Sequence, residues 1–169
     1  MATSLPYELL IIPIDHLHDL ASSVIPATLA YTHASNALPP AFVAARALAQ
    51  IDAGASAYWC STFYVLNTDN AHIVGSCGFK SAPQAGCVEI GYGISAECRK
   101  LGAASAAVQY LLQLAFDGGA EEVLATVNPD NLASTRVVQK LGFLNCGTFV
   151  DEQQEPLVHW VAHRPAPTV

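Results

Sequence analysis

The sequence predicts an α/β (α+β) protein of one domain, residues 1–169, with a mixed, mostly antiparallel twisted sheet flanked by helices. Three observations predict it. Strand-like and helix-like segments alternate in the order β, α, α, β, β, β, α, β, α, β, β. The three consecutive strands favour an antiparallel meander, because short turns join them. A chain of 169 residues, 52% of them hydrophobic, can bury a core of its own.

The first third of the chain begins with an expected strand and continues into two helices. Leu5 to Ile14 is apolar and contains a proline near each end, which predicts the opening strand. Asp15 is a candidate N-cap for a helix from His16 onward, because its carboxylate can accept the free amides of a first turn. Residues 32–40 predict a loop, and a second helix is expected over residues 41–51.

The middle of the chain predicts the meander. Residues 57–66 and 72–79 are rich in aromatic and branched side chains, and the polar tetrapeptide 67–70 between them is typical of a turn. A connection with proline and glycine leads into the third strand, residues 88–94.

The last third predicts two more helices and three more strands. An alanine- and leucine-rich helix ends near Phe116, and residues 122–127 predict a short strand. Asn131 is a good N-cap for a helix that closes at Gly142. The expected closing hairpin comprises residues 143–149 and 157–162.

The strand at residues 88–94 and the helix after it are the most informative stretch. The apolar side chains of this strand alternate, at Val88, Ile90, Tyr92 and Ile94. The opposite face carries Glu89 and two glycines, so it is nearly bare and leaves room for a ligand against the backbone. Free amides and the positive dipole end of the following helix would face the end of this strand. Such an arrangement favours an anion, and a pyrophosphate is the obvious occupant.

Composition narrows the classes of function. A net charge of -7 disfavours nucleic acid and suits a cationic substrate. No apolar run approaches the length of about 20 residues that spans a bilayer, and no signal-peptide pattern is present, so we expect a cytoplasmic protein without membrane contact. Five cysteines without a Cys-x-x-Cys pair predict reduced thiols and no metal site. With only 12% charged residues, some apolar surface is expected to be covered by a second copy in a homodimer.

Arg99-x-x-Gly102-x-Ala104 resembles the Arg/Gln-x-x-Gly-x-Gly/Ala signature of the GNAT superfamily, the acyl-CoA-dependent N-acetyltransferases. The preceding Glu-Ile-Gly-Tyr and the downstream segment 128–143 resemble the RimJ and RimL branch, which acetylates the N-termini of ribosomal proteins. The resemblance covers the second half of the chain strongly and the first half by layout alone. It implies the GNAT fold, with acetyl-CoA as co-substrate and no metal.

The resemblance also implies candidate catalytic groups. In many members of the superfamily a glutamate at the place of Glu89 is the general base, in some cases through a water. An acid that pairs with a neighbour on a half-exposed strand is the alternative for Glu89. A backbone amide near Tyr92 or Gly93 is the expected polariser of the thioester carbonyl, and Ile94 completes this part of the cofactor site.

The acid for the leaving thiolate is less clear, because Val138 stands where many members of the superfamily carry a tyrosine. Ser134 resembles the serine of the ribosomal-protein branch and is expected to reach the CoA sulfur. Asn131 resembles the residue that binds the pantetheine arm. Helix capping alone would also explain both side chains.

The turn into the long helix is the expected pyrophosphate cradle. Cations are unfavourable near the positive end of a helix unless an anion binds there, which favours binding over a merely solvated basic pair. The cradle comprises Arg99, Lys100, Leu101, Gly102, Ala103, Ala104 and Ser105.

The sequence thus predicts direct transfer of acetyl from acetyl-CoA to a primary amine in a ternary complex. The leading acceptor is a protein N-terminal α-amine, and a polyamine, amino acid or aminoglycoside is the alternative. A catalytically inactive CoA-binding module stays open because of Val138. Neither the acyl-chain preference nor the identity of the acceptor follows from the sequence.

Overall fold

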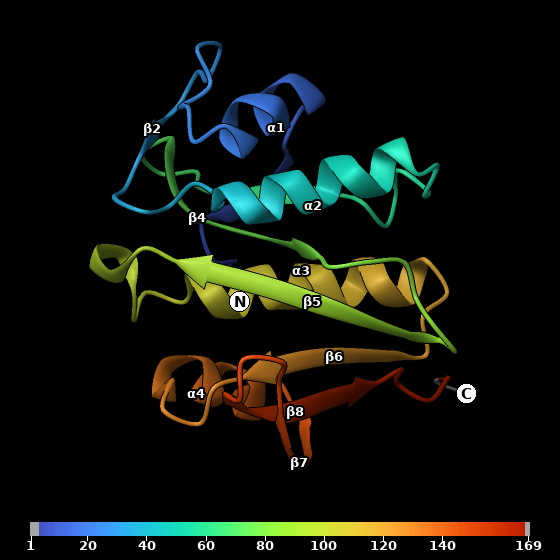
Figure 1. Cartoon of the computed structure of the whole chain (residues 1–169). Coiled ribbons are helices and arrows are strands. Elements are labelled where there is room, and N and C mark those ends of the chain that lie inside the picture. Colours follow the sequence, from blue (N-terminus) through green and yellow to red (C-terminus); the bar gives the residue numbers. More distant parts are fainter. Residues whose placement is uncertain (1–3, 168–169) are drawn as a thin grey trace.

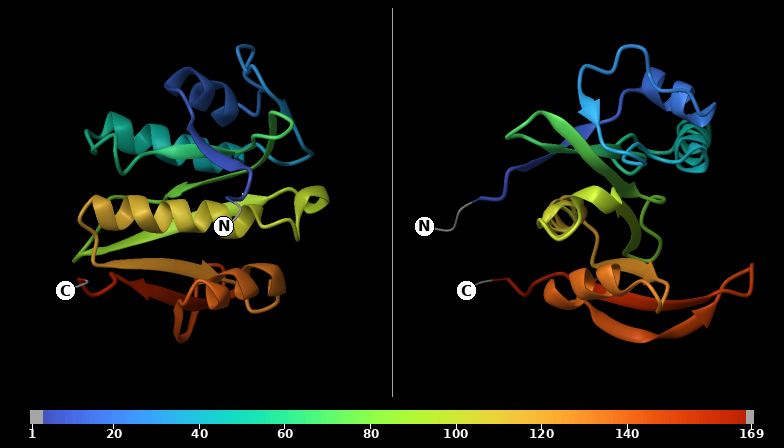
Figure 2. Two further views of the ribbon diagram at one scale, coloured as in Figure 1. Left: turned by 180° about the vertical axis from the view of Figure 1, so that it is seen from behind. Right: turned by 90° about the vertical axis from the view of Figure 1, so that its left-hand side faces the viewer.

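A computed structural model describes residues 4–167, so the first three and last two residues of the predicted domain lie outside the described part. One long sheet is covered by helices on both faces (Figures 1 and 2). The elements in chain order are β1 (Tyr7–Ile11), α1 (Ile14–Ala21), β2 (Thr32–His33), α2 (Ala41–Asp52), β3 (Thr62–Asn67), β4 (His72–Phe79), β5 (Cys87–Ile94), the 3-10 turn η1 (Ala96–Cys98), α3 (Ala103–Asp117), β6 (Glu122–Val127), α4 (Leu132–Lys140), β7 (Leu144–Val150) and β8 (Pro156–His163).

The strands lie in the order β1-β3-β4-β5-β6-β8-β7, with β2 paired to β4 beside this path. The expected meander is β3, β4 and β5, which pair antiparallel. The pair β5 and β6 is parallel and runs only from Cys87 opposite Glu122 to Glu89 opposite Leu124. Beyond that point the two strands part, as Figure 1 shows toward η1 and α4. The sheet is therefore mixed and mostly antiparallel, as predicted, and it is open in the middle.

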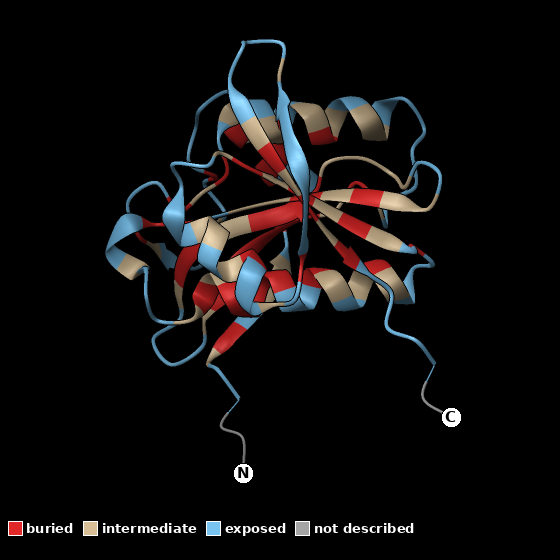
Figure 3. Ribbon diagram, turned by 90° about the horizontal axis from the view of Figure 1, so that it is seen from below, coloured by how far each residue is buried: buried red, intermediate tan, exposed pale blue. Residues whose placement is uncertain are grey.

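Alternation along the strands divides the interior into two cores. On β3, Phe63 and Val65 face α3, whereas Tyr64 and Leu66 face α1 and α2. The inner side of α3 is lined largely by alanine, which lets this helix lie close to the sheet. In Figure 3 the buried residues concentrate in the central strands, and β7 is exposed along its length.

Four expectations for the first half differ from the structure. The first strand is shorter than residues 5–14, because α1 already begins at Ile14 with Pro13 as its N-cap. The prediction that Asp15 caps this helix is wrong. Asp15 lies in the first turn, where its negative charge interacts favourably with the positive end of the helix dipole. Residues 32–40 also contain the two-residue strand β2, which pairs with β4 and was expected to be loop.

The fourth difference concerns the strand expected at residues 57–66, of which β3 keeps only the second part. The aromatic residues before it form a turn instead. The Tyr58 hydroxyl donates to the carbonyl of Leu114, and both Tyr58 and Trp59 lie against Gly118 at the end of α3. Their role in tertiary packing overrides their strand propensity.

The second half follows the prediction closely. The short strand is β6 at the expected residues, and Asn131 caps α4 by accepting a hydrogen bond from the amide of Ser134. Gly142 ends this helix region with a φ of 83°. The closing hairpin is β7 and β8, shifted by about one residue from the expected bounds.

We expect Gly75→Ala to lower the free energy of unfolding by about 2 kcal/mol, the usual scale of overpacking in a tight site. An added Cβ at Gly75 would lie 2.3 Å from the carbonyl oxygen of Gly93, so β4 and β5 would have to move apart. Denaturant titration measures the change. Gly93→Ala, on the facing strand, is the matched control because its Cβ would meet nothing within 4 Å. Equal losses in both variants would contradict the proposed close approach.

Candidate functional site

A cleft of about 550 Å³ opens where β5 and β6 part. Its walls come from β4, β5, β6, α2 and α4, together with the loops next to them. Six of the residues predicted from the sequence line this cleft: Tyr92, Gly93, Ile94, Arg99, Asn131 and Ser134. The structure thus brings together the predicted strand and the predicted capped helix, which are about forty residues apart in the chain.

The nearly bare face of β5 is confirmed. Val88 and Ile90 are buried on the other face, against α3. Gly93 is exposed, and a Cβ added there would meet nothing within 4 Å. Open space on this face is therefore real at Gly93, whereas the Lys80 side chain lies over Gly91.

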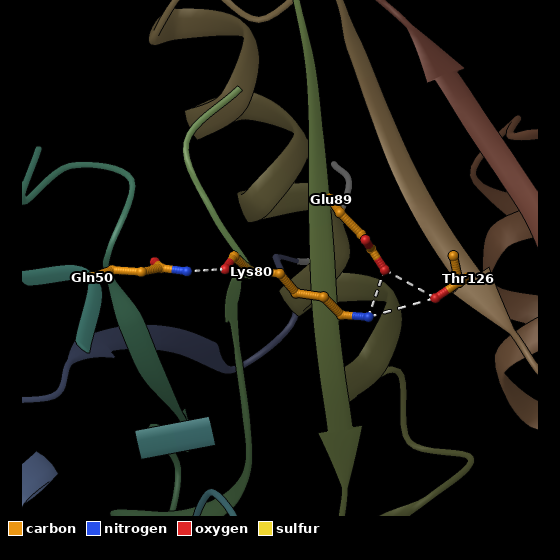
Figure 4. A network of polar contacts seen from close by, with 4 residues as sticks. All are labelled: Gln50, Lys80, Glu89 and Thr126. Carbon is orange, nitrogen blue, oxygen red and sulfur yellow. Dashed lines mark hydrogen bonds and ion pairs between the residues drawn. The ribbon is translucent and has the colours of Figure 1, made fainter. Parts of the chain in front are cut away.

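Glu89 is held by two neighbours beside the cleft (Figure 4). Its Oε1 accepts a hydrogen bond from Lys80 Nζ at 2.5 Å and another from Thr126 Oγ1 at 3.0 Å. Lys80 and Thr126 line the cleft, whereas Glu89 is not among the lining residues. The Glu89 and Lys80 side chains are 30% and 32% exposed, so water reaches both. The pairing expected as the alternative for Glu89 is present, and it leaves the second carboxylate oxygen without a partner among the described residues.

Lys80 also connects the cleft to α2. Gln50, near the end of α2, donates from Nε2 to the carbonyl oxygen of Lys80 at 2.5 Å (Figure 4). Arg46 lies four residues before Gln50, so both project from the same face of the helix. Arg46 lines the cleft and is half-buried. The wall that α2 contributes is therefore fixed to the end of β4 and carries a guanidinium.

Tyr92 crosses from β5 to α4. Its hydroxyl donates to the backbone carbonyl of Ser134 at 3.4 Å, which bridges the two elements across the cleft. Burial raises the pKa of the Tyr92 phenol above its usual value, so the hydroxyl keeps its proton at neutral pH. Val138 is fully buried in the core below. Tyr92 and Ser134 thus place hydroxyl groups at the α4 wall of the cleft. Val138, where many members of the superfamily carry a tyrosine, contributes only to packing in the core.

The turn into α3 has the backbone of an anion site. Lys100 has a φ of 66° and Gly102 a φ of 88°, so the chain twice enters the left-handed region within three residues. Amides of residues 99–105 donate no hydrogen bond to other described residues. Alternating left-handed residues and the free first turn of a helix both direct amides at one point. Apart from Arg99, the predicted cradle lies beyond the lining of the cleft, at its η1 end.

The residues missed by the sequence reasoning are Arg46, Lys80 and Thr126. Lys80 follows β4 directly, and the turn-rich segment after it indicated a hairpin, so its proximity to Glu89 could have been inferred. Thr126 lies in the short strand predicted at residues 122–127, but its pairing beside β5 was not predicted. Arg46 carries no sequence signal, because nothing in the pattern of α2 shows which face meets the sheet.

Three further features of the described residues concern metal sites, membrane-spanning helices and thiols. Across residues 4–167 there is no cluster of three His, Cys, Asp or Glu side chains that could hold a metal ion. None of the helices in that range has the length and apolar character needed to cross a membrane. All five cysteines are free thiols, with Cys60 and Cys77 buried.

Comparison with known families decides the classification. The model of the acetyltransferase (GNAT) domain matches residues 11–144. The chain belongs to the GNAT acetyltransferase family. The match extends over the cleft, including both helices of the first half that the sequence reasoning related to the family only by layout.

One curated relative and two solved structures are similar to the chain. The chain is 28% identical over 102 residues to the N-acetyltransferase YjdG of Bacillus subtilis, covering 59% of this chain and 58% of YjdG, so it spans a little over half of that relative's length. The ribosomal-protein-S5-alanine acetyltransferase of Vibrio fischeri shares its fold, with a TM-score of 0.66, 15% identity and coverage of 94% and 93%. A spermidine N-acetyltransferase chimera with Vibrio cholerae SpeG does so too, with a TM-score of 0.64, 15% identity and coverage of 94% and 95%.

The backbone at the start of α3 yields a prediction for CoA binding. Gly102→Ala places a side chain at a φ of 88° and within 3.1 Å of Leu5, so the loop must shift and the free amides lose their common direction. We expect the Kd for CoA, measured by calorimetric titration, to rise about tenfold, since redirecting charge-assisted hydrogen bonds costs on the order of 1.5 kcal/mol.

Gly54→Ala is the matched control for this variant. Gly54 has a φ of 82° beyond the end of α2, and its added Cβ would meet nothing within 4 Å. Both variants carry a similar backbone cost of about 1 kcal/mol in stability, but only Gly102→Ala should weaken CoA. Unchanged CoA binding in a folded Gly102→Ala protein would show that these amides do not hold the pyrophosphate.

Proposed function

We propose that this protein transfers the acetyl group of acetyl-CoA directly to a primary amine inside the cleft between β5 and β6. One observation carries the proposal: a single cleft reaches from Arg99, which directly precedes the free amides at the start of α3, to the wall formed by α2. A cofactor and an acceptor can therefore meet over the bare face of β5. Such a ternary complex needs no covalent intermediate on the protein.

The residues at the cleft support distinct roles toward acetyl-CoA. The amides of residues 99–105 would hold the pyrophosphate, with Arg99 and Lys100 adding charge. Asn131 and Ser134 would lie along the pantetheine arm, because both line the α4 wall. Gly93 lies opposite Ser76 in the ladder with β4, so its own amide points toward β4. The amide of Tyr92 points to the open side of β5 and would polarise the thioester carbonyl.

The transfer forms one bond and breaks another. The amine nitrogen attacks the carbonyl carbon, the carbon-sulfur bond breaks, and the amine gives up one proton while the thiolate takes one. We assign the amine proton to Glu89 through a water, since the partner-free carboxylate oxygen is reached by solvent. We assign the Ser134 hydroxyl as the proton donor to the sulfur. The Tyr92 hydroxyl, which donates to the backbone carbonyl of Ser134, lies beside Ser134.

The leading acceptor is a protein N-terminal α-amine, in keeping with the shared fold of the ribosomal-protein acetyltransferase. A small-molecule amine is the alternative, in keeping with the shared fold of the spermidine enzyme. Homodimeric assembly and a cytoplasmic location stay predictions from composition.

The decisive experiment is turnover of acetyl-CoA, followed as release of free thiol, against N-terminal peptides, polyamines, amino acids and aminoglycosides. We expect one class of amine to accelerate thiol release well above the rate of hydrolysis. Calorimetric titration with CoA runs in parallel. CoA binding without transfer to any amine would instead favour a binding module, and no CoA binding would contradict the proposal altogether.

Glu89→Gln tests the proton acceptor. Glutamine keeps an oxygen for the hydrogen bonds from Lys80 and Thr126 but cannot take a proton, so kcat should fall about 100-fold while KM for acetyl-CoA stays the same. If Glu89 only positions Lys80, Glu89→Gln should retain nearly full kcat and Glu89→Ala should lose it. That pattern would remove Glu89 from the chemistry.

A further inference from the structure

The charge of the cleft is opposite to the charge of the chain. The protein has 14 acidic and 7 basic residues. Three of the seven basic residues line the cleft, Arg46, Lys80 and Arg99, and no aspartate or glutamate does so among the described residues. If charged residues were placed in the cleft lining at random, most of them would be aspartate or glutamate. The lining therefore favours anions, against the expectation from net charge that a cationic substrate binds.

Two of the three cations have an evident role. Lys80 is neutralised by Glu89 at 2.5 Å. Arg99 lies at the η1 end of the cleft, where its Nε donates to the carbonyl of Ile94, and it is adjacent to the free amides proposed to hold a pyrophosphate. Arg46 has neither a carboxylate nor a hydrogen-bond partner among the described residues, although it is half-buried. A guanidinium so placed is preorganised for an anion that arrives with a ligand.

The position of Arg46 separates this anion from the phosphates of CoA. Arg46 projects from the face of α2 that Gln50 fixes to the carbonyl of Lys80. This face lies at the end of β4, whereas the free amides precede α3 and the α4 wall borders β6. The anion bound by Arg46 would thus lie on the acceptor side of the reacting carbonyl.

We propose that the acceptor is an amine that carries a carboxylate close to the reacting nitrogen, and that Arg46 binds this carboxylate. The inference rests on the proposed acetyl transfer and names the chemistry of its acceptor. The carboxylate belongs either to a free α-amino acid or to an acidic residue at the start of a peptide. Polyamines and peptides that begin with basic residues meet an unfavourable charge at this wall.

The first experiment uses the unaltered protein and matched acceptors. Each α-amino acid is compared with its carboxamide, and peptides that begin with Asp or Glu are compared with those that begin with Asn or Gln. We expect kcat/KM to be roughly 10- to 100-fold higher for the carboxylate member of the productive pair, the range of a charge-assisted hydrogen bond. The carboxamide has the less basic amine, which by itself would favour its reaction, so a preference for the carboxylate cannot come from amine basicity.

The second experiment changes the guanidinium. Arg46→Gln should raise KM for the carboxylate acceptor roughly 10- to 100-fold, leave KM for acetyl-CoA unchanged, and abolish the preference over the carboxamide. Arg46→Lys should restore part of the preference because it keeps the charge but not the fork of donors. Arg136→Gln is the matched control: Arg136 is exposed on α4 outside the cleft lining, and the variant loses the same charge.

The outcomes separate the inference from the function on which it rests. Transfer to amines without preference for a carboxylate, or preference for spermidine, would overturn the inference and leave acetyl transfer standing. A rise in KM for acetyl-CoA in Arg46→Gln would assign Arg46 to a CoA phosphate and overturn it as well. Absence of transfer to every amine would contradict the proposed function itself. If Arg46→Gln does not fold, the matched acceptors still decide the matter.

Discussion

Parallel pairing between β5 and β6 stops after Glu89 and Leu124, and the cleft exists because of this early end. Each strand keeps its other neighbour: β5 continues to pair with β4, and β6 with β8. The backbone groups that lose a partner on the open side face a cavity instead of hydrophobic core, where water or a ligand can satisfy them. A continuous sheet of the same length would leave no room for a cofactor and an acceptor to meet.

The helices on the two faces turn this opening into an asymmetric site. The alanine-rich face of α3 packs closely on the sheet and sends its free first turn toward one end of the cleft. Helix α2 covers the other face and is fixed to β4 through Gln50. One end therefore presents backbone amides, and the other presents side chains. Backbone donors suit a constant group such as a pyrophosphate, whereas side chains can differ between relatives and select the acceptor.

Sequence reasoning succeeded where a local rule determines the structure. Asn131 caps its helix because its short side chain accepts a hydrogen bond from a free amide of the first turn. The bare face of β5 follows from the period of two along a strand. It failed where contacts with segments distant in the sequence determine the local structure. Asp15 had the chemistry of a cap, but the chain already turns helical before it. Tyr58 and Trp59 had the propensity of a strand, but the end of α3 offers them a better surface.

The same distinction applies to the site. Residues on β5, β6 and the start of α4 could be predicted because motif and periodicity place them together. Arg46 could not, since the rotation of α2 depends on how Ala44 and Ala47 pack against the sheet, and apolar residues surround this helix on several sides. The predicted hairpin brings Lys80 near Glu89, but which of their neighbours meet depends on the register between β4 and β5, which turn geometry sets.

Lys80 has a mechanical consequence as well as a chemical one. Its stem passes over Gly91, and its ammonium joins Glu89 on β5 to Thr126 on β6. Thr126 lies two residues beyond Leu124, where the parallel pairing ends. Hydrogen bonds between side chains thus connect β5 and β6 beyond the point where their backbone hydrogen bonds have ended. Side chains, not backbone hydrogen bonds, connect the two strands across this part of the gap. Single substitutions at these positions can therefore change the width of the cleft for acceptors of different size, while every strand keeps its register.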